Sequence, residues 1–461
     1  MAKTEGYQCT ECGWTSVRWV GRCGECQTWG SVVQRGAPKL KQVASVVPDA
    51  KAVPISQVAA DAASRRLTGI AELDRVLGGG VVPGAVVLLA GEPGIGKSTL
   101  LLEVAAKWAA AGRRTLYVSG EESAAQVKLR AVRTGALVDE LYLASENDLG
   151  TVLGHIEGLD PTLMVLDSVQ TIGTTEADGS PGGVTQVREV TGALVRVAKR
   201  RQLPVLIVGH VTKDGGIAGP RMLEHLVDVV LTFEGDRHSG FRMVRATKNR
   251  YGPADEVGCF EMGESGIVEV PDPSGLFMSR HAEPMPGTCV TVTMEGRRPL
   301  LAEVQALVAT SPYQTSPRRI THGIEQSRVA LILAVLERKA RLRLSQSDVY
   351  VSTVGGARLS DPSADLAAAV AIASAAVDRN YPQRVVALGE VGLAGDLRRV
   401  PGLERRLGEA SRLGMELAIV PTGSRDVTVK VPKLAGMRVV EAPTLADALG
   451  VLDLRRSAPG H

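Results

Sequence analysis

One segment of the chain has the glycine spacing of a phosphate-binding loop. It follows the apolar run Val86–Ala90 and precedes a helical pattern from Thr99 to Ala111. In the spacing G-x-x-x-x-G-K-S, glycines let successive backbone N–H groups point at phosphates beside a helix N-terminus. A fortuitous glycine-rich turn is the alternative, but the strand–turn–helix context favours binding and hydrolysis of a nucleoside triphosphate. The loop consists of Gly91, Glu92, Pro93, Gly94, Ile95, Gly96, Lys97 and Ser98.

The last two residues of this loop have separate expected roles. Lys97 is expected to neutralise the β and γ phosphate oxygens, and the hydroxyl of Ser98 to bind Mg²⁺. The second group on the metal side is expected to be an acidic residue at the end of another buried strand. Asp167 ends the apolar run Leu163–Asp167 and fits that place. The predicted cofactors are therefore ATP and Mg²⁺.

Further polar residues follow two other strand-like runs. In open parallel sheets the ligand lies beyond the carboxyl ends of the strands. Glu121 and Glu122 follow Thr115–Ser119, and we expect Glu121 to orient the attacking water. An acidic residue that complements a helix dipole is the alternative for either glutamate, and it fits Glu122 better. His210 follows the run Pro204–Gly209 at the same predicted edge.

Two glycine-rich loops leave these strand ends. One covers residues 176–183 and the other residues 214–220. Long glycine-rich loops inside a compact core are usually functional or disordered, and two beside one predicted ligand site favour function. We expect both loops to be flexible.

The N-terminal segment has the cysteine spacing of a metal site. Two C-x-x-C pairs are separated by ten residues, which fits four thiolates around one tetrahedral Zn²⁺. A pair of disulfides is the alternative, but a phosphate-binding-loop protein without a secretion signal belongs in a reducing compartment. The four predicted ligands are Cys9, Cys12, Cys23 and Cys26. Trp14, Trp19 and Trp29 lie in the same segment, and we expect them to pack around a metal-dependent core rather than stack on bases.

Composition and hydrophobic periodicity divide the 461 residues into four parts. We predict a zinc finger over residues 1–33, a linker over 34–64, and an α/β ATPase domain with a mostly parallel sheet over 65–270. Residues 271–461 are expected to form a second α/β or α+β domain. The net charge of +3 is too small to diagnose nucleic-acid binding. The chain has no apolar stretch of about 20 residues, so we expect a soluble, cytoplasmic protein with no membrane partner.

Several motifs together resemble the bacterial RadA (Sms) recombination and repair proteins. They are the four-cysteine module, the phosphate-binding loop, the pentapeptide Lys248-Asn249-Arg250-Tyr251-Gly252, and the C-terminal segment Asp361-Pro362-Ser363-Ala364-Asp365. The family pattern of the pentapeptide is Lys-Asn-Arg-Phe-Gly, so Tyr251 replaces a phenylalanine and keeps the ring. The resemblance covers essentially the whole chain.

The resemblance implies a RecA-like ATPase core that assembles as a ring, usually a hexamer, on DNA. The expected activity is a DNA-dependent ATPase motor that promotes branch migration of recombination intermediates and repair of stalled or broken forks. Single-stranded and branched DNA and a RecA-type recombinase are the implied partners. A nucleotide-switched ring that binds proteins without moving on DNA is an alternative that the sequence allows.

The resemblance also implies roles for individual residues. Glu121 is the water-activating glutamate, His210 the strand-end sensor, and loops 171–183 and 211–220 face DNA. Lys248 and Arg250 are expected to act across a subunit boundary on the transferring phosphoryl group. Surface charges that follow a β-strand are the duller alternative for both cations. The residues expected to contact DNA are Lys213, Arg221, Lys248, Asn249, Arg250, Tyr251 and Gly252.

The C-terminal domain resembles the proteolytic domain of Lon, with Ser363 at the place of the nucleophile. The place of the partner lysine is taken by Glu404, and the chain has no lysine from Ala340 to Val429. Because a serine without a base is a weak nucleophile, we expect no active protease. We predict instead a domain that serves ring assembly and DNA contact, in which Ser363 is a helix N-terminal serine. Candidate phosphate neutralisers are Arg341, Arg343, Arg358, Arg384, Arg398 and Arg399.

Overall fold

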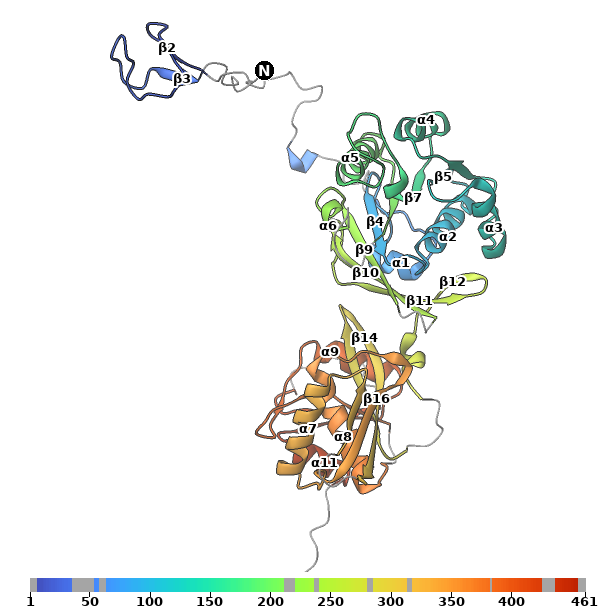
Figure 1. Ribbon diagram of the computed structural model, residues 1–461. Coiled ribbons are helices and arrows are strands. Elements are labelled where there is room, and N and C mark those ends of the chain that lie inside the picture. Colours follow the sequence, from blue (N-terminus) through green and yellow to red (C-terminus); the bar gives the residue numbers. More distant parts are fainter. Residues whose placement is uncertain are drawn as a thin grey trace, which may run out of the picture. The chain divides into compact units, whose positions relative to one another are not determined.

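Figure 1 shows the computed structural model of the chain. The chain forms two compact units. The first unit is Met1–Ala60 and the second is Asp61–His461. The described residues are 6–34, 54–57, 64–210, 220–235, 240–279, 285–312, 317–381, 384–424 and 436–454. No helix in these ranges has the length and apolar character needed to cross a lipid bilayer.

The first unit contains a small antiparallel sheet beside the cysteines. Strand β1 (Tyr7–Cys9) pairs with β2 (Thr15–Ser16) on one side and with β3 (Val32–Gln34) on the other. Its buried core consists of two cysteines and a valine, with Tyr7, Trp14 and Val20 packed against them. A short 3-10 helix, η1 (Ile55–Gln57), is described separately.

The expectation that all three N-terminal tryptophans pack in this core is wrong for two of them. Trp14 is half-buried, but Trp19 is 64% exposed and Trp29 is 74% exposed. The interior of the sheet is small and is already filled by Cys9, Cys23 and their neighbours, so it has room for one indole at its edge.

The second unit begins with a mixed sheet whose central strands are parallel. The strand order is β12-β11-β10-β9-β4-β8-β7-β5-β6. The pairs from β9 to β6 are parallel, and β10, β11 and β12 add an antiparallel edge. The strands are β4 (Val86–Gly91), β5 (Thr115–Ser119), β6 (Leu141–Ser145), β7 (Leu163–Asp167), β8 (Val205–His210), β9 (Val229–Gly235), β10 (Phe241–Asn249), β11 (Val257–Gly263) and β12 (Gly266–Glu269).

Helices cover both faces of this sheet because alternate strand residues point to opposite sides. Val87 and Leu89 share a core with helices α1, α2 and α3, whereas Val86 and Leu88 share a core with α4 and α5. The predicted parallel sheet with helices on both faces is therefore confirmed. The helices are α1 (Ala71–Leu77), α2 (Lys97–Ala110), α3 (Ala124–Thr134), α4 (Leu149–Leu159), α5 (Val184–Arg201) and α6 (Pro220–Leu223).

The C-terminal residues form a second mixed sheet, in the order β15-β16-β14-β13-β17-β20-β21. Helices α7, α8 and α11 pack on one face, and α9 packs on the other. The alanine-rich apolar run over residues 365–376 lies in helix α8. The elements are β13 (Thr288–Glu295), β14 (Arg298–Thr310), β15 (Arg319–His322), α7 (Gln326–Lys339), β16 (Ser347–Thr353), α8 (Asp365–Val377), β17 (Val385–Ala387), α9 (Leu403–Arg412), β20 (Leu417–Pro421), β21 (Arg438–Ala442) and α11 (Leu445–Val451).

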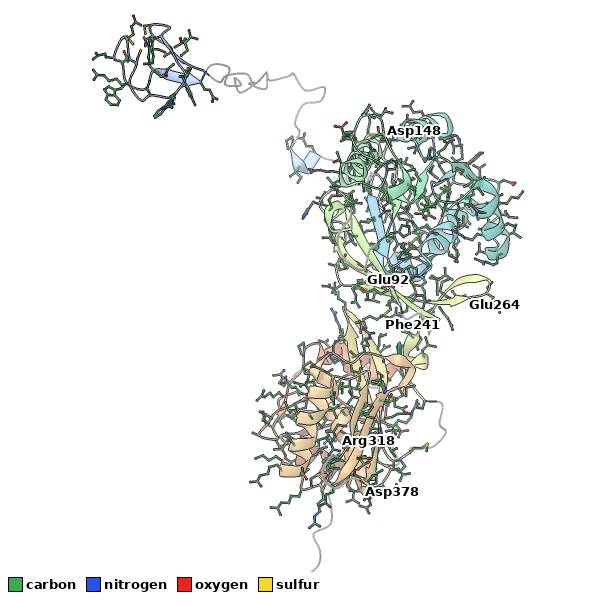
Figure 2. All side chains as sticks on the ribbon, viewed as in Figure 1. Glu92, Asp148, Phe241, Glu264, Arg318 and Asp378 are labelled. Carbon is green, nitrogen blue, oxygen red and sulfur yellow. The ribbon has the colours of Figure 1, made fainter. Side chains whose placement is uncertain are left out.

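Specific contacts join the two sheets of the second unit. The ring of Phe241, labelled in Figure 2, meets the ring of Phe277 edge to face, with centroids 5.2 Å apart. Arg298 at the start of β14 forms a buried ion pair with Glu72 of α1. The same carboxylate accepts a hydrogen bond from the backbone N–H of Cys259 at 2.9 Å. A charged network thus connects α1, β11 and the C-terminal sheet.

Candidate functional site

The predicted phosphate-binding loop lies between β4 and α2, as the sequence indicated. Gly94 and Gly96 have φ angles of 77° and 113°, which residues with a side chain rarely adopt. A side chain at Gly91 would meet the carbonyl oxygen of Phe233 at 2.6 Å. The backbone of β9 therefore closes one side of the loop, and only glycine fits there. The loop ends at the first turn of α2, where free backbone N–H groups favour an anion.

The amine of Lys97 lies within this loop. Its Nζ atom donates hydrogen bonds to the carbonyl oxygens of Gly91 and Glu92, both at 2.9 Å. Burial lowers the pKa of Lys97 from its ordinary value, and the carboxylates of Asp167 and Glu121 act in the opposite direction. An ammonium group has three donors, so one N–H remains for a phosphate oxygen. Glu92, labelled in Figure 2, is exposed.

Asp167 ends β7 with one oxygen bonded and the other available. The hydroxyl of Tyr117 donates to its Oδ2 atom at 2.7 Å. Its Oδ1 atom is buried, and no donor within the described ranges reaches it. A buried carboxylate oxygen without a partner is costly unless a ligand satisfies it, and such an oxygen suits Mg²⁺ or its water ligands. Together with the half-buried Ser98 hydroxyl, Asp167 fits the predicted magnesium site.

Three strand ends meet at Glu121. Its Oε1 atom lies 2.9 Å from Nε2 of His210 at the end of β8, and the hydroxyl of Ser168, after β7, donates to it at 2.6 Å. The hydrogen bond from His210 is the main reason that the pKa of Glu121 falls to about 2. Glu121 is therefore ionised across the physiological range. The sequence placed Glu121 and His210 at one edge, but nothing in it indicated that they touch.

Glu122 has a different environment. Its carboxylate pairs with Arg130 of α3, whose guanidinium also lies 4.0 Å from Asp167. The N-terminus of α3 is capped by Ser123, which forms a reciprocal capping box with Gln126. Glu122 thus precedes the cap of α3 and is neutralised by a cation of that helix, whereas Glu121 faces the strand ends.

The loop after β7 is held by one buried glutamine that the sequence analysis missed. The side-chain amide of Gln186, in the first turn of α5, donates to the carbonyl oxygens of Thr174 (3.0 Å) and Gly179 (3.2 Å). Its oxygen accepts from the N–H of Thr174 at 2.9 Å. These bonds hold the loop backbone at Thr174 and Gly179, while the expected flexibility of residues 176–183 stays a prediction. No motif or spacing marked Gln186.

The second predicted DNA-facing loop is mostly outside the described residues. Residues 211–219, including Lys213, lie outside them, and so does the side chain of Arg221. The backbone is described again from Pro220, in α6. Their predicted contacts with DNA remain predictions.

The sequence suggested that Lys248 follows a strand, but it lies inside strand β10. The pairing of β10 with β9 shifts register between Ala246 and Lys248. Such a bulge redirects side chains. The Nζ atom of Lys248 donates to the carbonyl oxygens of Val227, at 2.8 Å, and Glu224. Arg250 is 54% exposed and lies 3.4 Å from the carboxylate of Asp228.

The other residues of the pentapeptide shape a turn beside α1. The side chain of Asn249 accepts from the N–H of Tyr251 at 2.9 Å and donates to the carbonyl oxygen of Leu77 at 3.3 Å. A side chain at Gly252 would meet the side-chain nitrogen of Asn249 at 3.0 Å. Asn249 therefore fixes the backbone that carries Arg250, and Gly252 leaves room for its side chain.

Tyr251 differs from the family pattern by its hydroxyl, which has a specific partner. Lys199 of α5 donates to this hydroxyl at 2.9 Å and to the buried Asp228 at 2.6 Å. Asp228 also accepts from the N–H of Val86, at the start of β4. The pentapeptide is thus connected to the strand that leads into the phosphate-binding loop.

The C-terminal serine is buried and bonded to an arginine. Ser363 is 0% exposed, and its hydroxyl accepts a hydrogen bond from Arg406 of α9 at 2.8 Å. Arg406 also pairs with Asp361 and donates to the carbonyl oxygens of Pro401 (3.0 Å) and Val292. Two predictions are corrected here. The group facing Ser363 is Arg406 rather than Glu404, and Asp361, not Ser363, caps the 3-10 helix η6 (Pro362–Ala364).

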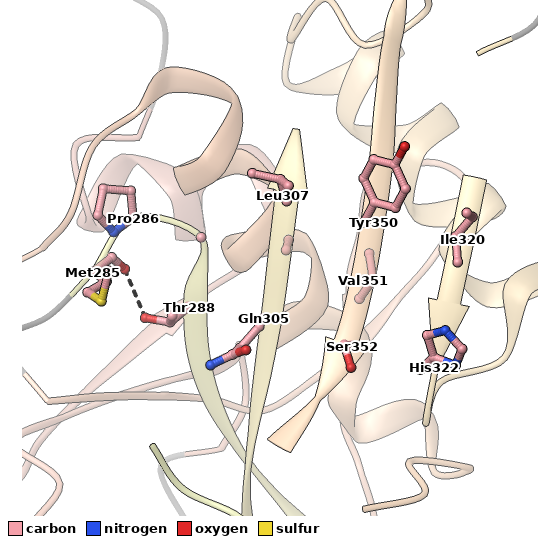
Figure 3. A pocket seen from close by; sticks show the side chains of 12 residues that line it. Met285, Pro286, Thr288, Gln305, Leu307, Ile320, His322, Tyr350, Val351 and Ser352 are labelled. Atoms are coloured by element: carbon pink, nitrogen blue, oxygen red, sulfur yellow. Dashed lines mark hydrogen bonds between the residues drawn. The ribbon is translucent and has the colours of Figure 1, made fainter. Parts of the chain in front are cut away.

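A pocket of about 460 Å³ lies on the C-terminal sheet, and none of its lining residues was predicted (Figure 3). Leu307 points to the same side of β14 as Leu301, which packs in the core beneath α9. Helix α9 leaves the region around Leu307 uncovered, and both Leu307 and Ile320 are exposed. Its lining also carries polar side chains, among them Thr288, Gln305, Ser352 and His322, which Figure 3 labels. Exposed apolar side chains such as Leu307 and Ile320 are typical of a contact surface.

The four N-terminal cysteines come together as predicted. Their sulfur atoms all lie within 4.8 Å of one another. The Sγ atoms of Cys9 and Cys26 are 3.6 Å apart, and those of Cys12 and Cys23 are 3.5 Å apart. Four thiolates on a tetrahedral Zn²⁺ require sulfur separations of about 3.8 Å, so the cluster fits this ion.

Comparison with known families agrees with these sites. Residues 7–34 match the rubredoxin metal binding domain, residues 52–216 an AAA domain, and residues 326–424 the subunit ChlI of Mg-chelatase. The fold and the nucleotide site define a P-loop ATPase with an N-terminal four-cysteine zinc module and a C-terminal Lon-like domain. The predicted fold class is thus confirmed.

The relatives specify the family. A protein of Mycolicibacterium smegmatis named DNA repair protein RadA is 55% identical over 453 residues, which are 96% of each chain. The protein of that name from Bacillus subtilis is 43% identical over 456 residues, 97% of this chain and 99% of its own. The chain belongs to the RadA family, as its motifs indicated.

Proposed function

We propose that this protein is a DNA-dependent ATPase motor that acts in recombinational DNA repair and promotes branch migration. The observation that carries the proposal is the 2.9 Å contact between Glu121 and His210. This contact joins Glu121, whose carboxylate suits phosphoryl transfer, with His210, which immediately precedes the predicted DNA-facing loop 211–220. A change at the nucleotide then alters this contact and with it the start of the loop. DNA binding in turn alters the position of Glu121.

The proposed chemistry assigns one task to each group. Lys97 binds the terminal phosphates of ATP, and Ser98 and Asp167 hold Mg²⁺, which neutralises charge on the phosphate oxygens when bound. Glu121 orients the attacking water. With a pKa of about 2, its carboxylate serves to position that water more than to remove its proton.

We further propose a homo-oligomeric ring, a hexamer, on single-stranded or branched DNA in the cytoplasm, with a RecA-type recombinase as partner. Arg250, which is 54% exposed, is the cation that we propose acts on the phosphates of a neighbouring subunit. Lys248 bonds to the backbone of Glu224 and Val227 and supports this segment. The apolar surface around Leu307 and Ile320 supports assembly. The domain boundaries are proposed at residues 1–33, 34–64, 65–270 and 271–461.

The arrangement around Ser363 argues against protease activity. A nucleophilic serine needs a base to take its proton, and a guanidinium is protonated at all physiological pH values. Ser363 is buried and accepts a hydrogen bond from the guanidinium of Arg406. We therefore assign the C-terminal domain to assembly and DNA contact.

The test is ATP hydrolysis with and without single-stranded DNA, under matched salt because phosphate contacts are salt-dependent. We expect DNA to stimulate the intact protein. Lys97→Ala abolishes hydrolysis, and Lys248→Ala abolishes the stimulation. Lys128→Ala, at an exposed position of α3, is the matched control and behaves as the intact protein. Hydrolysis that is indifferent to DNA would favour a nucleotide-switched ring that binds proteins.

A further inference from the structure

Two exposed indole rings lie together on the zinc module. A Cβ atom placed on Gly21 would lie 3.7 Å from Trp19 and 3.7 Å from Trp29, so the rings flank the same glycine. They are 64% and 74% exposed. Large aromatic side chains in water lose the stabilisation that burial would give them. Neither ring contributes to the described core of the module, so folding does not explain their position.

The hairpin that carries the rings is held in one conformation. The N–H of Gly30 donates to the carbonyl oxygen of Gly21 at 2.9 Å, and a β-bridge joins Arg22 to Trp29. The guanidinium of Arg22 lies 5.8 Å from the Trp29 ring centroid. It is fixed there by hydrogen bonds to Gln27, at 2.9 Å to the carbonyl oxygen and 2.6 Å to the side chain. The platform therefore needs little ordering when a ligand binds.

We propose that Trp19 and Trp29 form a platform on which the zinc module stacks bases of single-stranded DNA. Every base has a flat face that stacks on an indole, and an adjacent arginine neutralises phosphate. Arg22 lies at the Trp29 ring, and the exposed Arg18 precedes Trp19 in the chain. Isolated rings flanked by arginines suit unstacked bases better than a duplex, whose bases are already stacked. The inference rests on the proposed function as a DNA motor and adds a second contact outside the ATPase domain.

Tryptophan fluorescence of the full-length protein tests this directly. Trp108 is buried and donates to Thr162, and Trp14 is half-buried, so most of the emission that a ligand can reach comes from Trp19 and Trp29. We expect oligothymidylate to quench the emission. In the Trp19→Ala/Trp29→Ala variant we expect no quenching. We also expect its affinity for the oligonucleotide to fall by about tenfold or more. Val33→Ala, at an exposed position of the same module, is the matched control. Zinc content verifies that each variant retains its fold.

A strand of the same length without bases separates stacking from charge. The intact protein should bind this strand no better than the double variant does, because only phosphates remain to be recognised. Equal affinity of intact protein and double variant for oligothymidylate, or an equal loss for both strands, overturns the platform. Loss of binding to a protein partner with unchanged DNA affinity would assign the rings to that partner instead. ATP hydrolysis by the double variant that depends on Lys97 and is still stimulated by DNA shows that the proposed function stands independently.

Discussion

The nucleotide site and the C-terminal Ser363 cluster combine similar side chains but differ in what they leave unbonded. At the nucleotide site, Asp167 keeps a buried oxygen without a donor among the described residues, and Lys97 keeps a third N–H. In the C-terminal cluster, Arg406 bonds to Ser363, Asp361 and backbone carbonyls. Residue types alone do not distinguish a ligand site from a structural network. The difference lies in whether the polar atoms are already satisfied.

Apart from Lys97→Ala, the largest effect is expected at Glu121. Glu121→Gln keeps the shape of the side chain but removes the charge that orients water. We expect the kcat for ATP hydrolysis to fall by about a hundredfold or more, with nucleotide binding retained. Glu122→Gln, whose carboxylate pairs with Arg130, should change kcat little. Equal losses in the two variants, measured by steady-state hydrolysis and nucleotide titration, would remove the distinction between the two glutamates.

Arg406→Met tests whether the C-terminal cluster is structural. The substitution leaves the half-buried Asp361 and the buried hydroxyl of Ser363 without their cation. We expect a loss of about 3 kcal/mol in the free energy of unfolding of the second unit, measured by denaturant titration. ATP hydrolysis by the folded protein should be retained. Arg405→Met, at the exposed neighbouring position, is the control and should be nearly neutral. A stable Arg406→Met variant would show that the network contributes little.

The contact between His210 and Glu121 predicts a pH effect. In the intact protein the pKa of Glu121 is about 2, so its carboxylate stays ionised as pH falls to 4.5. His210→Ala removes the main cause of that shift, and the pKa rises towards the ordinary 4.5. The acid limb of the activity profile therefore moves to higher pH in the variant. His210→Gln, which retains a donor, should keep the limb of the intact protein. Circular dichroism at each pH verifies folding, and superimposed profiles for all three proteins would contradict the assigned cause.

The smallest effect is expected for Ser363→Ala. The hydroxyl accepts one hydrogen bond, and Arg406 retains its other partners, so we expect a stability loss of about 1 kcal/mol. DNA-stimulated ATP hydrolysis should be unchanged. If the variant lost an activity that the intact protein has, the cluster would belong with the nucleotide site as a place of chemistry.

The sequence predicted well the buried strands, the phosphate-binding loop and the zinc cluster, because each of them requires particular residue types. Strands Thr115–Ser119 and Leu163–Asp167 appear at the predicted boundaries, because strands buried in a parallel sheet are continuous apolar runs. The glycines of the phosphate-binding loop and the paired cysteines are equally specific. These features placed the ligand edge of the sheet and the zinc cluster without knowledge of side-chain contacts.

The parts that it missed depend on side-chain direction. Glu404 matched the place of a lysine in the chain, but two residues along a helix turn the side chain by about 200°, and Arg406 points inward instead. The bulge in β10 redirects Lys248 by the same kind of local geometry. Trp19 and Trp29 resemble core residues by composition, yet the metal site leaves no interior for them. Sequence spacing does not determine the directions of these side chains, because they depend on which other residues already occupy the interior.

The ion pair between Glu72 and Arg298 has a practical consequence for dissecting the protein. A fragment that ends near residue 270 would contain the carboxylate and lack its guanidinium, although its sheet would be complete. The buried carboxylate would lose its buried cation and keep only the exposed Arg75, 3.4 Å away, and the backbone N–H of Cys259. An isolated ATPase fragment would therefore be expressed more successfully with Glu72 replaced by glutamine. The same replacement in the full chain would leave Arg298 without its counter-ion.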